Sequence, residues 1–321
     1  MDSVNMDNGV VIQKPTKNVH SSTKKKKLVF FTLMSLPFLI QAAIFYVYVN
    51  FSTITLSFFE YHYEPGVGDV SSFVWFKNFG YVLGYVFSPN EVSMFLVSFV
   101  MYAFILCIVT PVVVFFSFYI YKKFFLSGFF RIILFMPQVI SSVVYVTVYK
   151  TMLGPVYSQL SGSPGIFDGN DTTVMIAVIG YTFWTAFGSN ILLMSGAMGG
   201  IDDSVVEACY LDGCNMTKEF IHVTLPSIYP TITTFVVLDL TTLFTNQLSL
   251  MTFFGQNAPI KSVGYFMELN LLKTPGLYSL NETMWFLYPQ LAAMGLLITL
   301  TVAPICIIVR KIMERVGPSE D

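Results

Sequence analysis

Four polar side chains that could bind a ligand lie within one long apolar stretch, residues 231–254. They are Asp239, Thr242, Asn246 and Gln247. An ionisable side chain in a segment long enough to cross a bilayer is costly and by default marks a functional site. On a continuous helix Asp239 and Asn246 are two turns apart on one face, so the stripe suits a ligand rich in hydroxyl groups. Alternatively, these groups hydrogen-bond to neighbouring helices and only hold the helices together.

A second apolar stretch, residues 172–198, carries Tyr181, Trp184 and Asn190. Tyrosine and tryptophan combine a flat apolar ring with a polar group. A sugar face could therefore stack on the two rings, with Asn190 as a polar neighbour. The alternative is that these side chains pack between helices and bind nothing. Both interpretations stay open at the level of the sequence.

The sequence lacks the motifs of the common enzyme active sites. It contains no G-x-x-x-x-G-K-[ST] loop to hold phosphates, no H-E-x-x-H motif and no G-x-S-x-G motif. The three histidines, His20, His62 and His222, fall on different segments, and no basic patch with interleaved aromatics suggests nucleic acid. We therefore expect neither an enzyme, nor a metal site, nor a nucleic-acid-binding protein.

The four cysteines show no spacing typical of metal ligands. They are Cys107, Cys209, Cys214 and Cys306. Two lie in apolar stretches and two in a polar loop, which indicates neither a disulfide framework nor a zinc site. We interpret them as inert thiols.

Composition indicates that an integral membrane protein positions these residues. Of the 321 residues, 55% are hydrophobic and only 11% are charged, whereas a soluble domain carries about 25% charged residues. Six stretches are long and apolar enough to cross roughly 30 Å of hydrocarbon. They are residues 28–50, 93–120, 130–152, 172–198, 231–254 and 284–309. The sequence thus predicts an all-α membrane protein with six transmembrane helices.

The positions of the basic residues predict the orientation of these helices. If the N-terminus is cytoplasmic, 13 of the 17 lysines and arginines lie in cytoplasmic segments, as the positive-inside rule requires. Both termini are therefore expected in the cytoplasm. We expect residues 1–27 to form a basic, disordered tail, residues 28–312 the membrane domain, and residues 313–321 a short tail. The first apolar stretch is too long for a signal peptide and is interpreted as a retained span.

The polar loop between the fourth and fifth stretches, residues 199–230, carries signals for a short helix. Ser204 and Glu207 are spaced as in a capping box, which predicts a helix over about 205–211. The Asp212-Gly213 pair predicts the end of this helix, because glycine readily adopts the left-handed conformation found there.

A second short helix is expected in the same polar loop, over about 216–222, with Asn215 as its cap. Pro226 and Pro230 then set the start of the fifth span. A loop built in this way is rigid, and a rigid cytoplasmic loop suggests a docking surface for a partner. The same signals would also serve simply to complete a connection between two helices.

The polar loop resembles the "EAA" cytoplasmic loop of the permeases of binding-protein-dependent ABC importers. That loop reads E-A-A, then D-G three positions on, then a segment that ends in I-x-L-P. The matching residues here are Glu207, Ala208, Asp212, Gly213, Leu225 and Pro226. The sequence departs from the pattern at Cys209 and Cys214, where the family usually has alanine, and at Val223, which replaces isoleucine.

The resemblance continues outside the loop and covers most of residues 28–312. Residues 131–153 are similar to the third-span stretch of the family, with its F-x-P-x-x-I-S pattern, and WFKNFGYVL is similar to an external segment, with Phe79 in place of a tyrosine. The pattern is most similar to the carbohydrate-uptake permeases of the maltose and glycerol-phosphate type. It implies a type I ABC importer permease bundle in the bacterial cytoplasmic (inner) membrane.

The resemblance also implies partners. They are a second, related permease subunit, two cytoplasmic ABC ATPase subunits that bind ATP and Mg²⁺, an extracytoplasmic solute-binding protein, and the lipid bilayer; this chain itself would bind no cofactor. The implied ATPase-coupling residues are Ser204, Glu207, Ala208, Leu211, Asp212, Gly213, Phe220, Leu225 and Pro226.

The solute would follow a path lined by the seven polar and aromatic residues named at the start. The same architecture carrying another solute, such as glycerol phosphate or a polyamine, is one alternative, and a membrane scaffold without transport activity is another. The sequence does not name the sugar, because the binding protein usually sets that choice.

Overall fold

The computed structural model describes residues 19–64, 68–89, 91–162, 165–167, 170–273 and 288–318. The chain divides into two compact units, Met1–Thr55 and Leu56–Asp321. Each unit is described by itself below.

The first unit is a single helical run. Helix α1 (Val19–Gln41), the π-helical segment η1 (Ala42–Tyr48) and α2 (Val49–Ser57) follow one another without a break, and the apolar part of the run has no buried residues. The first predicted span is therefore helical and extends beyond its expected ends. Within the expected N-terminal tail, α1 already begins at Val19, and residues 1–18 lie outside the described residues.

The second unit begins with a two-stranded antiparallel hairpin that the sequence did not predict. Strand β1 (Phe59–Glu64) pairs with β2 (Gly68–Phe73), with Phe59 opposite Phe73. Helix α3 (Lys77–Val86) follows. The buried Asn78 amide donates to the carbonyl oxygens of Ser57 at 2.9 Å and Phe59 at 3.0 Å, so it holds α3 against the start of β1.

Three of the predicted spans in this unit match continuous helical runs. The second is α4 (Val92–Phe104), η2 (Ile105–Val109) and α5 (Thr110–Tyr121). The fourth is α8 (Asp171–Met198) and the sixth is α15 (Tyr288–Val316), while residues 284–287 lie outside the described residues. By length and composition the described residues contain three helices that could cross a membrane, namely Lys26–Ser57, Val92–Tyr121 and Tyr288–Val316, or up to six spans if each bent helix pair, α8 among them, counts as one.

The third predicted span is two helices rather than one. Helix α6 (Ser127–Val139) and helix α7 (Ser142–Ser161) meet at an angle of 109°. Ile140, between them, has an extended backbone with ψ 139°. Pro137 lies in the last turn of α6, where its ring removes the N–H that would bond the carbonyl four residues before it and weakens this turn.

The fifth predicted span is also interrupted. Helix α12 (Tyr229–Thr241) ends thirteen residues before the expected end at residue 254, at the start of an irregular segment, and is followed by α13 (Leu250–Phe254) and α14 (Val263–Lys273). We call residues 242–249 the intramembrane break.

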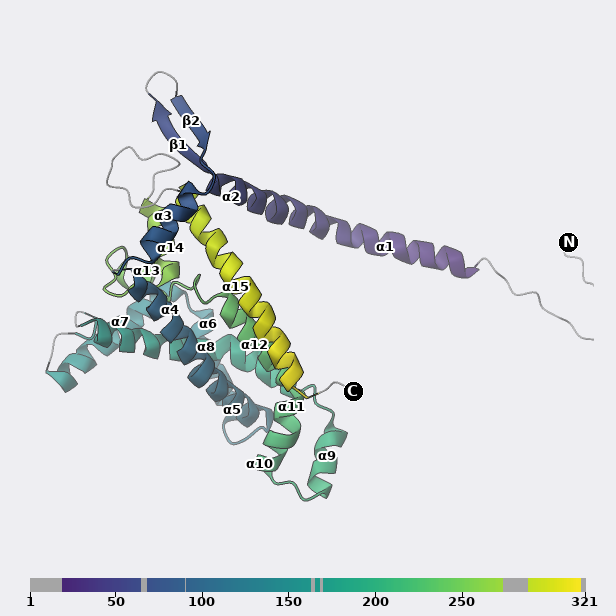
Figure 1. Ribbon diagram of the computed structural model, residues 1–321. Helices are drawn as coiled ribbons and strands as arrows, with labels where there is room; N and C mark the ends of the chain where they lie inside the picture. The colour runs from purple at the N-terminus through teal and green to yellow at the C-terminus, as the bar shows by residue number, and fades with distance from the viewer. Residues whose placement is uncertain are drawn as a thin grey trace, which may run out of the picture. The chain divides into compact units, whose positions relative to one another are not determined.

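The connections of the second unit gather at two ends (Figure 1). The polar loop forms α9 (Asp203–Leu211), α10 (Met216–Glu219), η3 (Phe220–Thr224) and α11 (Leu225–Ser227). These helices lie by the ends of α5 and α15, and we call this the loop end; the hairpin, α3, α13 and α14 lie at the opposite, hairpin end. The loop end therefore collects three segments predicted to share one side of the membrane: the α5–α6 connection, the polar loop and the C-terminal tail.

A buried cluster anchors the loop end. It joins Val113 and Phe118 of α5 to Ile191 and Met198 of α8, and Phe220 of the polar loop packs against it. Because lipid is as apolar as these side chains, their close van der Waals packing rather than exclusion from water holds the helices together.

Candidate functional site

Helix α9 of the polar loop begins with an aspartate cap. Asp202 has an extended backbone, and its side chain accepts a hydrogen bond of 2.9 Å from the backbone N–H of Ser204. The prediction that Ser204 and Glu207 form a capping box was therefore wrong, because Ser204 already lies inside the helix and Asp202 occupies the cap position. The bond from Ser204 lowers the pKa of the exposed Asp202 carboxyl, since it stabilises the charged form.

The turn after α9 confirms the predicted helix end and corrects the assignment of two cysteines. Gly213 has φ +78°, a conformation that glycine adopts without strain. The backbone N–H of Cys214 donates to the carbonyl oxygen of Cys209 at 2.9 Å, and the two sulfur atoms form a disulfide. The expectation of inert thiols was wrong for this pair, because the left-handed turn brings the two side chains together.

The second short helix also begins as predicted. The Asn215 side chain accepts from the backbone N–H of Lys218 at 2.9 Å, which makes it the cap of α10. The helix continues as the π-helical segment η3 to Thr224 and then as α11. The segment expected over 216–222 is thus helical throughout and longer than expected.

The nine predicted coupling residues divide into an exposed set and an anchored set. Leu211 is 89% exposed. The exposed set is Ser204, Glu207, Ala208, Leu211, Asp212 and Gly213. The anchored set, Phe220, Leu225 and Pro226, is partly buried, and Phe220 and Leu225 pack on the core of the loop end. The polar loop therefore presents one free face and is rooted in the membrane unit by the other.

Sequence analysis missed a buried carboxylate that fastens this loop. Glu219 is fully buried, and its Oε2 accepts a 2.5 Å hydrogen bond from the Tyr210 hydroxyl while its Oε1 forms an ion pair with the Lys122 ammonium. Burial lowers the Lys122 pKa, but the Glu219 carboxylate, together with smaller contributions from Tyr210 and Tyr121, outweighs burial and the net pKa is raised. The hydrogen bond to Glu219 raises the pKa of the Tyr210 phenol. The sequence signal is weak, since Lys122 and Glu219 are far apart in the chain.

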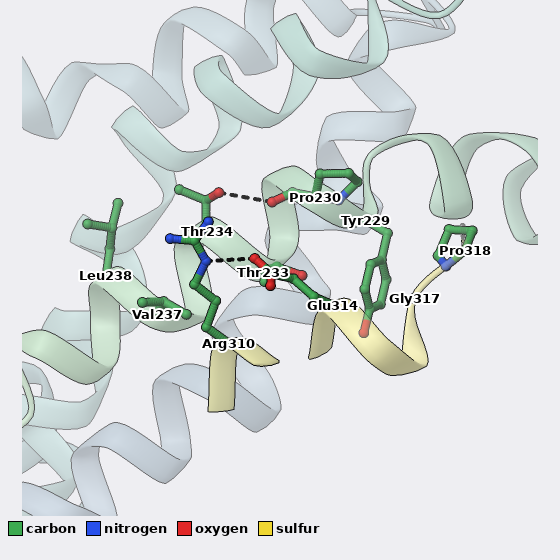
Figure 2. A pocket seen from close by; sticks show the side chains of 10 residues that line it. All are labelled: Tyr229, Pro230, Thr233, Thr234, Val237, Leu238, Arg310, Glu314, Gly317 and Pro318. Carbon is green, nitrogen blue, oxygen red and sulfur yellow. Dashed lines mark hydrogen bonds and ion pairs between the residues drawn. The ribbon is translucent and has the colours of Figure 1, made fainter. Parts of the chain in front are cut away.

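A cleft of about 670 Å³ lies next to the polar loop, where the start of α12 meets the end of α15 (Figure 2). On its wall Arg310 and Glu314 form an ion pair of 2.7 Å. The Tyr229 hydroxyl donates to the carbonyl oxygen of Met313 at 3.0 Å, and a Cβ atom on Gly317 would lie 2.3 Å from the Tyr229 ring. The start of α12 is therefore held closely against the end of α15.

The intramembrane break is built by backbone contacts and by one asparagine. The Asn246 side chain accepts from the backbone N–H of Leu248 at 2.8 Å, and Leu248 and Ser249 both have positive φ angles. The Ser262 hydroxyl donates to the carbonyl oxygen of Asn246 at 3.0 Å. The prediction that Asn246 lies two turns beyond Asp239 on one helix face was therefore wrong, because the helix ends at Thr241.

Three of the predicted path residues nevertheless meet at one small hollow. Asp239, Thr242 and Asn246 line it together with Ser98 and Tyr102 of α4. Gln247 does not line this hollow, and its buried Oε1 has no hydrogen-bond partner among the described residues. Within the described ranges, no three His, Cys, Asp or Glu side chains gather as they would around a metal ion.

The predicted path residues of α8 do not line that hollow. Tyr181 is only 5% exposed and packs edge-on against Phe253 of α13, with ring centroids 4.9 Å apart. Trp184 is half-exposed and borders an apolar groove of about 350 Å³ with Tyr145. Asn190 lies beyond a 40° bend in the helix. Tyr181 is therefore a core residue, and of the two rings only Trp184 offers a surface.

Comparison with known proteins shows what kind of protein carries these features. YurN of Bacillus subtilis, a probable ABC transporter permease protein, is 31% identical over 128 residues, which are 37% of this chain and 44% of the relative. AraP, the arabinooligosaccharides transport system permease protein of Bacillus subtilis, is 28% identical over 109 residues, 32% of this chain and 35% of the relative. The matched segments thus span less than half the length of these curated relatives.

A solved structure shares the fold. A bacterial ABC transporter involved in the import of the acidic polysaccharide alginate contains a chain that matches with a TM-score of 0.67 at 16% identity, over 94% of this chain and 100% of that chain. This likeness confirms the expected type I importer permease fold.

Residues 79–320 match the family described as binding-protein-dependent transport system inner membrane component. The match spans well over half of the sequence, and it agrees with the interpretation of the polar loop as part of a permease. Members of this family are membrane components of transporters and not enzymes, as the sequence predicted. The chain therefore belongs to the family of binding-protein-dependent transport system inner membrane components.

Proposed function

We propose that this chain is a permease subunit of an ATP-driven importer that carries a sugar or oligosaccharide across the bacterial cytoplasmic membrane. The observation that carries the proposal is the polar loop, a capped helix that ends at a left-handed glycine and presents its free face at one end of a membrane unit. Caps and a fixed turn also occur in loops that only connect helices, so the proposal depends on their combination with the free face of the loop and with the family of the chain.

The loop end faces the cytoplasm in this proposal. The basic residues described at that end support the orientation, since cytoplasmic segments are enriched in lysine and arginine. They are Lys122, Lys123, Arg131, Lys218, Arg310, Lys311 and Arg315. Fewer basic residues, among them Lys77 and Lys261, lie in the segments of the hairpin end.

The exposed face of α9 docks on a cytoplasmic ATPase subunit. Glu207 supplies a charge, and the exposed Val205 and Leu211 supply apolar surface, a combination suited to a helix that lies in a groove of its partner. ATP and Mg²⁺ bind to two such ATPase subunits, and a second permease subunit completes the translocation path.

A solute-binding protein delivers the sugar at the hairpin end. A matching solved structure is described as an alginate ABC transporter in complex with an alginate pentasaccharide-bound periplasmic protein, and AraP is named for arabinooligosaccharides. The hollow at the intramembrane break carries one carboxylate, Asp239, and hydroxyl or amide groups but no basic side chain. These groups can hydrogen-bond to the hydroxyl groups of a sugar, and the hollow, of about 10 Å³, must widen to admit one.

The proposal is tested by purifying the chain with its partner permease, ATPase and binding protein and reconstituting them in liposomes. Uptake of an arabino-oligosaccharide that depends on ATP and on the binding protein is the expected result. Failure of the ATPase to copurify would reject the docking role of the polar loop. Uptake of glycerol phosphate or spermidine, but of no oligosaccharide, would reject the sugar and retain the permease.

A further inference from the structure

The buried carboxylate of Glu219 connects three segments that are distant in the sequence. Its two oxygens are shared between the Lys122 ammonium, just after α5, and the Tyr210 hydroxyl near the end of α9. Glu219 itself belongs to α10 and is fully buried, and the Lys122 side chain is only 17% exposed. The ends of α5, α9 and α10 are therefore fixed to one point.

A buried ion pair of this kind is a poor source of stability. Removing two charges from water is costly, and apolar residues of similar size often stabilise a fold as well or better. Such a pair does impose a definite geometry, because a displaced partner would leave an uncompensated buried charge. The Lys122–Glu219 pair therefore fixes the position of the polar loop relative to the end of α5.

The surroundings of the pair make the connection stiff. The Lys122 ammonium also lies 5.2 Å from the ring centre of Tyr121 and 5.6 Å from that of Tyr210, where cations are attracted to the ring faces. Phe220, the residue after Glu219, packs on Phe118 with ring centroids 4.8 Å apart. An ionic and an apolar contact thus join the polar loop to the last turn of α5.

The helix that receives these contacts reaches the hollow at the intramembrane break. Residues Val92–Tyr121 form one continuous membrane-spanning run, and its residues Ser98 and Tyr102 line the hollow beside Asp239. Tyr102 and Lys122 are about 30 Å apart along a helix of this length. The polar loop is therefore linked to the hollow in two ways. One link is the chain itself, which continues into α12 through a bend of 62°. The other is the contact with Lys122, which follows the continuous α4–α5 run.

We propose that Lys122, Glu219 and Tyr210 act as positioning residues that make the polar loop and the α4–α5 run move together. A displacement of α9 by the ATPase then reaches Ser98 and Tyr102 on the wall of the hollow. This inference rests on the proposed function, because it requires an ATPase to move the loop. It goes beyond docking, since none of the three residues needs to contact the ATPase.

The test measures the amount of solute transported per ATP hydrolysed, in the complete importer reconstituted in liposomes. The double variant Lys122→Met, Glu219→Gln removes both charges, leaving no buried ion unpaired. We expect it to retain the ATPase on purification and to hydrolyse ATP, with a loss of about tenfold in transport per ATP. The exchanged pair Lys122→Glu, Glu219→Lys restores an ion pair under the Tyr210 hydroxyl and should recover a large part of the loss.

The matched control is the exposed ion pair Arg310–Glu314 at the same end of the unit, whose side chains are 66% and 53% exposed. Arg310→Gln, Glu314→Gln should leave transport per ATP within about twofold of the unmodified protein. Normal transport per ATP in the double variant at Lys122 and Glu219 would overturn the inference. So would a loss that the exchanged pair does not relieve at all, because that result indicates a general structural role.

A third variant tests the inference if the double variant does not insert in the membrane. Tyr210→Phe removes only the hydroxyl that bonds Glu219 and should lower transport per ATP by about two- to fivefold, with ATPase binding unchanged. No change would overturn the inference. If the unmodified complex does not bind the ATPase, the proposed docking function is rejected instead. Failure of this inference and failure of the proposed function are therefore distinguishable.

Discussion

The polar loop and the intramembrane break are both interruptions between helices, but they are built in opposite ways. The polar loop takes its shape from neighbours in the sequence: Asp202 caps α9, Gly213 turns the chain, and Asn215 caps α10. The intramembrane break takes its shape partly from α14 and the residue before it: the Ser262 hydroxyl donates to the carbonyl oxygen of Asn246, and Gly264 of α14 lies against the backbone of Thr245.

The polar loop is therefore rigid by itself, whereas the intramembrane break depends on the helices around it. A loop that is pushed by another subunit keeps its own geometry if its hydrogen bonds are local. Irregular backbone at membrane depth is tolerated where protein buries it or where it lines a cavity, so the break requires the helices around it. We expect substitutions in the loop to affect coupling, and substitutions at the break to affect the path or the fold.

The largest effect is expected from Gly213→Val in the polar loop, because a β-branched residue tolerates the left-handed conformation least. The φ angle of +78° disfavours any residue with a Cβ atom, although no atom lies within 4 Å of the Cβ position, so the change acts through the backbone and not through a clash. We expect more than about tenfold loss of uptake, with reduced copurification of the ATPase and normal membrane insertion. Gly196→Ala, at a helical glycine with open space around it, is the control and should transport normally.

Asp239→Asn should have the next largest effect and should act differently. The amide keeps the size of the side chain and removes the charge from the hollow. If Asp239 contacts the solute, uptake falls by about tenfold while the ATPase still copurifies in full. Asn246→Asp is the companion variant, because a carboxylate can still accept the bond from Leu248 and maintain the turn. Unchanged uptake and specificity in Asp239→Asn would exclude this residue from the path.

The sequence predicts a region well when the contacts that shape it are between residues close together in the chain. The helix end at Gly213 and the cap at Asn215 were predictable, because both depend on residues a few positions apart. The cap at Asp202 was misplaced by two residues, since aspartate and serine are both good caps. The family of the chain was recognisable from the same short segment.

The remaining features depend on contacts between distant residues, which one sequence does not reveal. Residues 231–254 are apolar enough for a single span, and the contacts that Ser262 and Gly264 make with Asn246 and Thr245 at the early helix end come from a distant part of the chain. Glu219 reads as one more charge in a polar loop, and its burial becomes evident only when Lys122 is placed beside it. The same holds for Tyr181, whose ring is enclosed by Phe253.

Gly264→Ala tests whether the break depends on α14. A Cβ atom at this position would lie 2.4 Å from the carbonyl oxygen of Thr245, and backbone cannot move aside as a flexible side chain can. Overpacking of this kind costs about 1–3 kcal/mol, which should appear as a lower melting temperature of the purified complex in detergent. At the control position, Gly295→Ala, the nearest atom is a methionine methyl at 3.8 Å, and the melting temperature should not change. Equal melting temperatures for both variants would contradict this account of the break.

The smallest expected effect concerns the cap of α9 and its dependence on pH. The hydrogen bond from Ser204 lowers the pKa of Asp202 in the folded loop, so the carboxylate stabilises the helix at pH values above its unfolded pKa of about 3.9. This contribution is lost as the pH falls through the lowered pKa. Hydrogen exchange of the α9 amides, corrected for the intrinsic rate at each pH, should show weaker protection in that acidic range. In Asp202→Asn the cap can still accept the bond but does not titrate, so the protection of α9 should no longer change over this range. If the protection of α9 in that variant still changes with pH, another carboxylate of the loop causes the effect. The stability of α9 would then depend less on the Asp202 cap than its hydrogen bond to Ser204 indicates.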